Sequence, residues 1–107
     1  MKKGDICLFN LTKGLGHEQS GNRPGIVVSN LVNGMLMVIP LTTNLEALRF
    51  SHTLTLIPDN KNKLTSESVA LVFQLKSLDK SRVIQKMGVV DAITYKNLKS
   101  ILNTLFK

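Results

Sequence analysis

The sequence predicts a mainly β domain, a small barrel or strongly bent sheet of five or six short strands with one packing helix at the C-terminus. Three observations support this class: segments of strand length recur between residues 5 and 90, turn and loop residues separate them, and the apolar spacing becomes helical only near the C-terminus. A chain of 107 residues has room for one core, so we expect a single domain over residues 1–107.

The expected strands combine apolar runs with alternating segments. The first mixes β-branched and aromatic side chains, and the fourth alternates Thr with Leu, which is the period of a half-buried strand. Between the second and third strands, Asn33-Gly34 favours a hairpin because both residues tolerate positive φ. The six segments are residues 5–11, 26–29, 35–39, 52–57, 68–75 and 84–90, the last being weakest around Gly88.

The C-terminal segment has the spacing of an amphipathic helix, expected over about residues 92–106. Asp91 is the expected N-cap, and Lys107 lies at the end where the helix dipole favours a cation. A shorter helical turn is expected over residues 78–82, with Ser77 as its cap. The apolar stripe of the long helix follows the i, i+3, i+4, i+7 pattern and consists of Leu98, Ile101, Leu102 and Leu105.

The chain carries an excess of positive charge, with 14 Lys and Arg against 7 Asp and Glu and a net charge of +7. Such an excess favours a polyanionic partner, because basic side chains that bind phosphates release counterions. The single Cys7 can form no internal disulfide and fits a buried thiol in a reducing compartment. No apolar run approaches the roughly 18 residues of a membrane span, and no signal peptide is recognisable. We therefore expect a cytoplasmic protein.

Residue spacing argues against several nucleotide and metal sites. Residues 16–21 have the spacing of the first half of a P-loop, but Asn22-Arg23 follow where Lys-Ser/Thr would be required. His17 has no second His four residues further on, and two His and one Cys far apart make no metal-ligand set. We therefore expect neither a metal nor a cofactor.

Four stretches of the sequence carry motifs in a fixed order. They are Lys3-Gly4-Asp5-Ile6; Gly16-His17-Glu18-Gln19-Ser20-Gly21-Asn22-Arg23-Pro24 with Ile26-Val27-Val28-Ser29-Asn30; Val38-Ile39-Pro40-Leu41-Thr42-Thr43; and Gln74-Leu75-Lys76-Ser77-Leu78-Asp79-Lys80-Ser81-Arg82. Together they resemble the MazF/PemK-type toxins. That family is known by a Lys/Arg-Gly-Asp start, a Glu-Gln-x-Gly-x-Arg-Pro loop, a strand ending in Pro-x-Thr-Ser/Thr and a Gln-x-Arg/Lys-Thr/Ser-x-Asp-Lys-x-Arg segment.

The resemblance implies an SH3-like barrel of five to seven strands with a terminal helix, working as a homodimer. It implies metal-independent, sequence-specific cleavage of single-stranded RNA, with mRNA as the substrate. The expected products are a 2′,3′-cyclic phosphate or 3′-phosphate and a free 5′-hydroxyl. The expected protein partner is a cognate acidic antitoxin that neutralises the toxin, and the complex of the two is expected to bind DNA.

By the same resemblance Arg23 and Thr42 are the catalytic pair. Arg23 can present a fork of donors to phosphate oxygens, and because a guanidinium holds its protons tightly we favour charge stabilisation over general acid catalysis. Thr42 can donate its hydroxyl to the phosphate or orient the proton being moved. The residues expected to contact RNA are Gln19, Thr43, Gln74 and Lys76.

The general base is not assigned by the motifs. Many members of the family carry an acid at the position before the glutamine that matches Gln74, and this chain has Phe73 there. His17 is the first substitute, because an imidazole titrates near neutral pH and this residue lies in the Arg23 loop. Glu18 is the second, although its carboxylate is better suited to anchoring the loop through backbone N–H groups.

The sequence leaves two other functions open. One is a topoisomerase poison, since a related toxin group shares the barrel and blocks gyrase through its C-terminal helix; that group does not carry the motifs of Arg23 and Thr42. The other is a non-catalytic RNA- or peptide-binding barrel that has lost its general base at Phe73.

Overall fold

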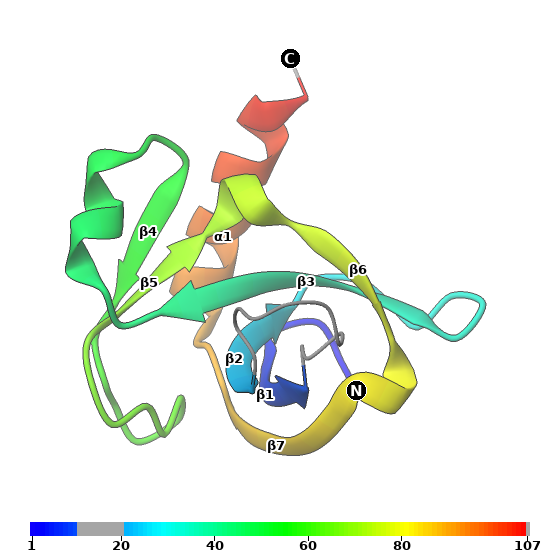
Figure 1. Ribbon diagram of the computed structural model, residues 1–107. Coiled ribbons are helices and arrows are strands. Elements are labelled where there is room, and N and C mark those ends of the chain that lie inside the picture. Colours follow the sequence, from blue (N-terminus) through cyan, green and yellow to red (C-terminus); the bar gives the residue numbers. More distant parts are fainter. Residues whose placement is uncertain (11–20, 107) are drawn as a thin grey trace.

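The computed structural model describes residues 1–10 and 21–106 (Figure 1). Over these residues the chain forms antiparallel strands followed by a C-terminal helix, so the expected mainly β class is confirmed. The strands are β1 (Asp5–Asn10), β2 (Asn22–Val27), β3 (Met35–Thr42), β4 (Thr53–Leu56), β5 (Ser68–Leu71), β6 (Lys76–Asp79) and β7 (Val83–Val89). The helical elements are the 3₁₀ turns η1 (Leu45–Arg49), η2 (Val72–Gln74) and η3 (Lys80–Arg82) and the α-helix α1 (Ala92–Leu105).

The strand expected over residues 68–75 is wrong in its second half. β5 ends at Leu71, and η2 turns the chain before β6 begins at Lys76. The turn is closed by a bond of 3.1 Å from the Leu75 N–H to the Val72 carbonyl, and Val72 is buried. A buried side chain at this position anchors the turn, and periodicity along one strand could not predict that anchor.

The helical turn expected over residues 78–82 is shorter than predicted. β6 continues to Asp79, and the turn η3 begins only at Lys80. Its cap is Asp79 rather than Ser77, because the Asp79 carboxylate accepts a hydrogen bond of 2.9 Å from the Ser81 N–H.

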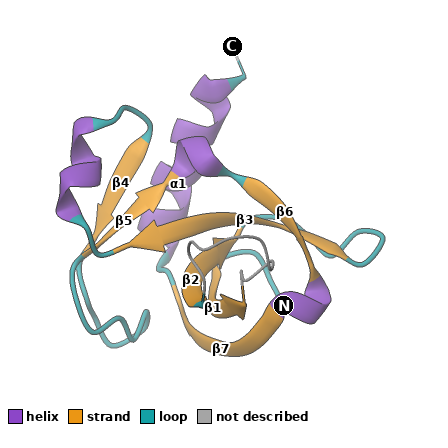
Figure 2. Ribbon diagram, viewed as in Figure 1, coloured by secondary structure: helices purple, strands orange, loops and turns teal. Residues whose placement is uncertain are grey.

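β3 is the strand that joins the two parts of the sheet. The strand order is β4-β5-β3-β2-β1-β7, and β6 pairs with the first half of β3 while β5 pairs with its end. The strands β1, β2, β3, β6 and β7 curl around a common interior, whereas β4 and β5 extend beside α1 (Figure 2). The end of β3 therefore lies where the curled part and the extension meet.

Both faces of the central strands are buried, in two separate clusters. Because side chains of a strand alternate between faces, neighbouring residues of β1, β2 and β3 contribute to different clusters, and this explains their continuous apolar runs. The cluster between the sheet and α1 includes Ile6, Ile26 and Ile39 of the strands, and Leu98 and Leu102 of the helix. The cluster inside the curl contains Cys7, Phe9, Val27, Leu36 and Val38.

The C-terminal helix agrees closely with its predicted bounds. The Asp91 carboxylate accepts a hydrogen bond of 2.7 Å from the Thr94 N–H, as expected of an N-cap. This bond lowers the pKa of Asp91, since it stabilises the charged form. Leu98 and Leu102 are buried against the sheet. Within the described residues, no helix is long and apolar enough to cross a membrane.

The Lys-Gly-Asp start of the chain has a structural role. Gly4 has a φ of +95°, a conformation that costs glycine little, and the Asp5 N–H donates to the Lys2 carbonyl at 3.0 Å to close the turn. The buried Asp5 carboxylate accepts from the Lys2 N–H at 2.9 Å and lies 3.4 Å from the Lys86 ammonium. The motif therefore fixes the beginning of β1.

Candidate active site

Arg23, Thr42 and Thr43 line one hollow of about 370 Å³ at the junction of β2, β3 and β5. These are three of the residues that the motifs single out, and they come from segments about twenty residues apart in the sequence. The hollow is lined by Asn22, Arg23, Pro24, Leu41, Thr42, Thr43 and Ser68. None of these lining residues carries a carboxylate or an imidazole.

The pairing of β2 with β3 ends close to Arg23 and Thr42. β2 and β3 are antiparallel, with Gly25 opposite Pro40. Arg23 and Thr42 each lie two residues beyond this last pair, and both line the hollow. Arg23 pairs with Phe9 of β1, whose side chain is buried. The backbone that carries the guanidinium is therefore held by β1.

Gly25 permits the close approach of β2 and β3. A Cβ atom at this position would lie 2.5 Å from the Val38 Cγ1 atom and 3.3 Å from the Ile39 carbonyl oxygen. Only a residue without a side chain fits there without movement of its neighbours. The glycine after the Arg-Pro of the loop motif thus sets the spacing between the strands that bear Arg23 and Thr42.

The Thr42 side chain is held by the turn that follows it. Its hydroxyl oxygen accepts a hydrogen bond of 3.1 Å from the Asn44 N–H. The Asn44 amide oxygen in turn accepts from the Glu46 N–H at 3.0 Å and caps η1. Because the hydroxyl uses a lone pair in this bond, its proton can be donated to a phosphate oxygen in the hollow.

Ser68 is a residue of the hollow that the sequence reasoning missed. It is 2% exposed, and its hydroxyl donates to the Ser66 carbonyl at 3.0 Å. β5 pairs with β3 so that Val69 lies opposite Thr42, and Ser68, the residue before Val69, lines the hollow together with Thr43. The only indication in the sequence is a hydroxyl at the start of an apolar strand, which by itself does not distinguish a site residue from a strand end.

Gln74 and Lys76 are not among the residues that line the hollow. Gln74 ends η2 and is exposed, and Lys76 begins β6, half-buried opposite Val38. Phe73, at the position where an acid was expected by resemblance, is 39% exposed, and its ring contacts that of Phe50 with centroids 5.6 Å apart.

His17, Glu18 and Gln19 lie outside the described residues. The other histidine, His52, has a φ of +61°, and its Nδ1 atom lies 3.0 Å from the Ser51 hydroxyl, outside the hollow. Across residues 1–10 and 21–106, no group of three or more His, Cys, Asp or Glu side chains is placed to hold a metal ion.

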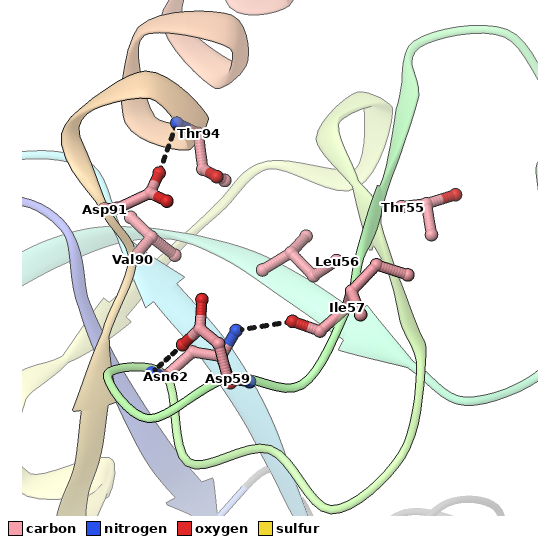
Figure 3. Close-up of a pocket in the computed structure, with 8 residues that line it drawn as sticks. All are labelled: Thr55, Leu56, Ile57, Asp59, Asn62, Val90, Asp91 and Thr94. Atoms are coloured by element: carbon pink, nitrogen blue, oxygen red, sulfur yellow. Dashed lines mark hydrogen bonds between the residues drawn. The ribbon is translucent and has the colours of Figure 1, made fainter.

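A second hollow, of about 230 Å³, lies at the N-terminus of α1 (Figure 3). It contains two carboxylates, but both are engaged by the backbone. Asp91 caps α1, and Asp59 accepts from the N–H groups of Lys61 at 2.9 Å and Asn62 at 2.7 Å. The Asn62 amide donates to the Ile57 carbonyl at 2.9 Å. These contacts shape the loop, so the arrangement is structural.

The antiparallel fold and the hollow lined by Arg23 and Thr42 agree with what the motif resemblance implies. The sequence model of the family described as "PemK-like, MazF-like toxin of type II toxin-antitoxin system" matches residues 2–106. The chain therefore belongs to the PemK-like and MazF-like toxins of type II toxin–antitoxin systems. The resemblance found in the motifs is confirmed.

Two curated relatives are named endoribonuclease MazF. The one from Staphylococcus saprophyticus is 28% identical over 109 residues, covering 98% of this chain and 88% of the relative. The one from Staphylococcus epidermidis is 30% identical over 91 residues, covering 81% of this chain and 75% of the relative.

Solved structures share the fold over nearly the whole chain. MazF from Deinococcus radiodurans has a TM-score of 0.77 at 29% identity, covering 99% of this chain and 96% of that one. The MazE–MazF complex from the same organism has a TM-score of 0.80 at 28% identity, covering 99% and 95%. A mycobacterial endoribonuclease in complex with its cognate antitoxin has a TM-score of 0.70 at 19% identity, covering 97% and 90%, and this shows the fold alone.

Proposed function

We propose that this chain is a toxin endoribonuclease that cleaves single-stranded RNA, with mRNA as its target, at the hollow between β2, β3 and β5. One observation supports this most: Arg23 and Thr42, a fork of donors and a hydroxyl, line the same hollow. The family, and relatives named endoribonuclease MazF, support the same activity.

In the proposed reaction the RNA supplies its own nucleophile. The 2′-oxygen attacks phosphorus as a base removes its proton, and the bond from phosphorus to the 5′-oxygen breaks as that oxygen gains a proton. A 2′,3′-cyclic phosphate and a 5′-hydroxyl result. Arg23 donates to the phosphate oxygens as negative charge builds on them. Thr42 donates its hydroxyl proton in a hydrogen bond to the same phosphate.

We assign the general base to the segment between β1 and β2. His17 is the first candidate and Glu18 the second, since both precede Arg23 in the same sequence motif. The lining residues seen in the hollow supply no carboxylate or imidazole for this step. Phe73 carries no titratable group. Thr43 is proposed to contact the RNA within the hollow, and Gln74 and Lys76 outside it. Gln19 is also proposed to contact the RNA, and it lies outside the described residues.

The proposed protein partners are a second copy of the chain and an acidic antitoxin. A net charge of +7 favours an acidic segment that competes with RNA for the same surface. Related structures include a MazE–MazF complex. We place the action in the cytoplasm, where mRNA is available and the buried, free Cys7 stays reduced.

The test is to incubate the pure protein with single-stranded RNA in EDTA and map the ends of the products. We expect cleavage with cyclic or 3′-phosphate ends. Arg23→Ala should abolish it, and Arg23→Lys should restore little, since an ammonium cannot present a planar fork. Loss of cleavage in EDTA that magnesium restores would refute the metal-free mechanism. Failure to cut naked RNA would favour a topoisomerase poison or a non-catalytic barrel.

A further inference from the structure

Two aromatic rings are paired at the surface of the extension formed by β4 and β5. Phe50 is 46% exposed and Phe73 is 39% exposed, and their ring centroids are 5.6 Å apart with the planes tilted by 54°. The Arg49 guanidinium lies 4.9 Å from the centroid of Phe50. The guanidinium is attracted to the face of the ring, and the two exposed rings offer an aromatic surface that a ligand can cover.

The aromatic pair is connected to the hollow by two short segments. The chain that leaves Thr42 passes through η1 to Phe50, and the chain that leaves Ser68 runs along β5 and η2 to Phe73. The Phe73 N–H donates to the His52 carbonyl at 3.3 Å, which ties the two segments together at their far ends. Figure 1 shows β5 running from the end of β3 toward the helical turn that precedes β6.

The length of this connection suits a single-stranded nucleic acid. From Ser68 to Phe73 the chain covers at most about 14 Å, at roughly 3.3 Å per residue along β5 and 2.0 Å per residue along η2. A base a few nucleotides from the cleaved phosphate would lie within that distance. Along η1 the negative Glu46 lies in the first turn and the positive Arg49 in the last, so the cation is at the aromatic end.

We propose that Phe50 and Phe73, with Arg49 beside them, form a stacking platform for a nucleobase that flanks the scissile phosphate. This inference rests on the proposed RNA cleavage and adds a determinant of substrate binding to it. Aromatic faces bind bases by stacking, and an arginine plane contributes to the stack while its charge attracts the backbone. The aromatic side chain at Phe73 thereby has a role in place of the expected acid.

The experiment uses the intact protein and an RNA that it binds but cannot cut. The cleavage site is first mapped, and an oligonucleotide is then made with a 2′-deoxy sugar at that position, which removes the nucleophile. Binding is measured at one fixed salt concentration for the wild type, Phe50→Leu and Phe73→Leu. The control is Ile84→Ala, because Ile84 is 47% exposed and lies on β7 at the opposite end of the strand order.

We expect each leucine variant to bind roughly 5- to 100-fold more weakly, since leucine keeps apolar area but lacks a π-face. The control should bind as the wild type does. The bases that flank the cleavage site are then replaced one at a time by abasic residues. We expect one position at which loss of the base weakens RNA binding by the wild type but has little further effect on binding by Phe50→Leu. That loss of additivity places the base on the platform. Because both rings are exposed, we expect both leucine variants to fold, and thermal melting checks this.

Three results would overturn the platform. One is equal RNA binding by the wild type and both leucine variants, while the wild type still cleaves RNA. Another is a change in the oligomeric state of the leucine variants, measured by sedimentation, that accounts for all of their weaker RNA binding. That result would make this face a contact between copies of the chain. A wild type that neither binds nor cleaves RNA would overturn the platform together with the proposed function, and so it is distinguishable from the first two.

Discussion

The hydroxyl oxygen of Thr42 accepts a hydrogen bond of 3.1 Å from the backbone N–H of Asn44, the residue that caps η1. One lone pair of the hydroxyl is therefore used by the protein, and the rotation of the hydroxyl is restricted. Its proton is directed away from that donor, and Thr42 lines the hollow together with Arg23. The turn after β3 thus prepares the hydroxyl as a donor.

The first prediction concerns this hydroxyl. Thr42→Val keeps the β-branched shape but removes the donor, and we expect the cleavage rate at saturating RNA to fall by on the order of 10² to 10³. Thr42→Ser keeps the donor and should retain most of the rate. The measurement is single-turnover cleavage, with thermal melting to verify the fold. A Thr42→Val protein with the wild-type rate would remove Thr42 from the mechanism.

A second prediction identifies the general base. If His17 is the base, cleavage should rise with pH as an imidazole with a pKa of about 6.5 loses its proton. His17→Ala should then remove this limb and slow the reaction by on the order of 10² to 10⁴. If Glu18 is the base, Glu18→Gln should be the damaging change and the limb should lie at lower pH. Full activity of His17→Ala with an unchanged pH profile would exclude His17.

Phe73→Asp tests the same step of proton removal, because it restores the acid that the resemblance leads us to expect at this position. Because Phe73 is 39% exposed, a carboxylate there would reach solvent, so the change should cost the contact with Phe50 but not leave a buried charge. Rescue of His17→Ala by Phe73→Asp would indicate that the side chain at this position reaches the reacting RNA. No rescue, together with weaker RNA binding, would agree with the stacking platform.

The third prediction concerns the packing of β2 on β3. Gly25→Ala would bring a methyl group 2.5 Å from the Val38 Cγ1 atom, and we expect it to destabilise the fold by about 1–3 kcal/mol and slow cleavage. Val38→Ala in the same chain should recover part of the loss, since it removes the atom in conflict. Denaturant unfolding of the two single variants and the double variant gives this coupling directly.

Gly88→Ala provides a comparison in which the added methyl group would meet backbone atoms, so no side chain can move to relieve the clash. A Cβ atom there would lie 2.5 Å from the backbone carbonyl oxygens of Lys61 and Asn62. We expect this variant to be destabilised more than Gly25→Ala, and truncating a neighbouring side chain should not restore it. A smaller loss at Gly88 than at Gly25 would show that the loop around Asn62 shifts easily.

The fourth prediction concerns the loss of folding stability at acid pH. Hydrogen bonds from backbone N–H groups lower the pKa of Asp79 and Asp91 from the ordinary value of 3.8. Because the folded-state pKa is the lower one, these carboxylates stabilise the fold above pH 3.8, and the stabilisation is lost as the pH falls through the folded-state values. The melting temperature of Asp91→Asn, measured across the acid range, should therefore vary less with pH than that of the wild type. Equal slopes would contradict the assignment.

The sequence by itself determined the elements that depend on neighbouring residues. The hairpin at Asn33-Gly34, the cap at Asp91 and the helix that follows are set by φ preferences and side-chain-to-backbone bonds within a few residues. The ordered motifs also predict Arg23 and Thr42 as site residues, because the spacing of a motif is a property of the chain alone, and both line one hollow in the structure. Such features need no knowledge of which strands pair.

Only the tertiary structure decided which distant segments meet. Ser68 enters the hollow because β5 pairs with the end of β3, and periodicity along β5 cannot specify that partner. The pairing of Phe50 with Phe73 depends equally on η2, a turn anchored by the buried Val72 in the middle of what the sequence predicted as one strand. Both cases have the same physical reason: register and burial are set by the packing of the whole sheet, whereas sequence patterns record only the preferences of each segment.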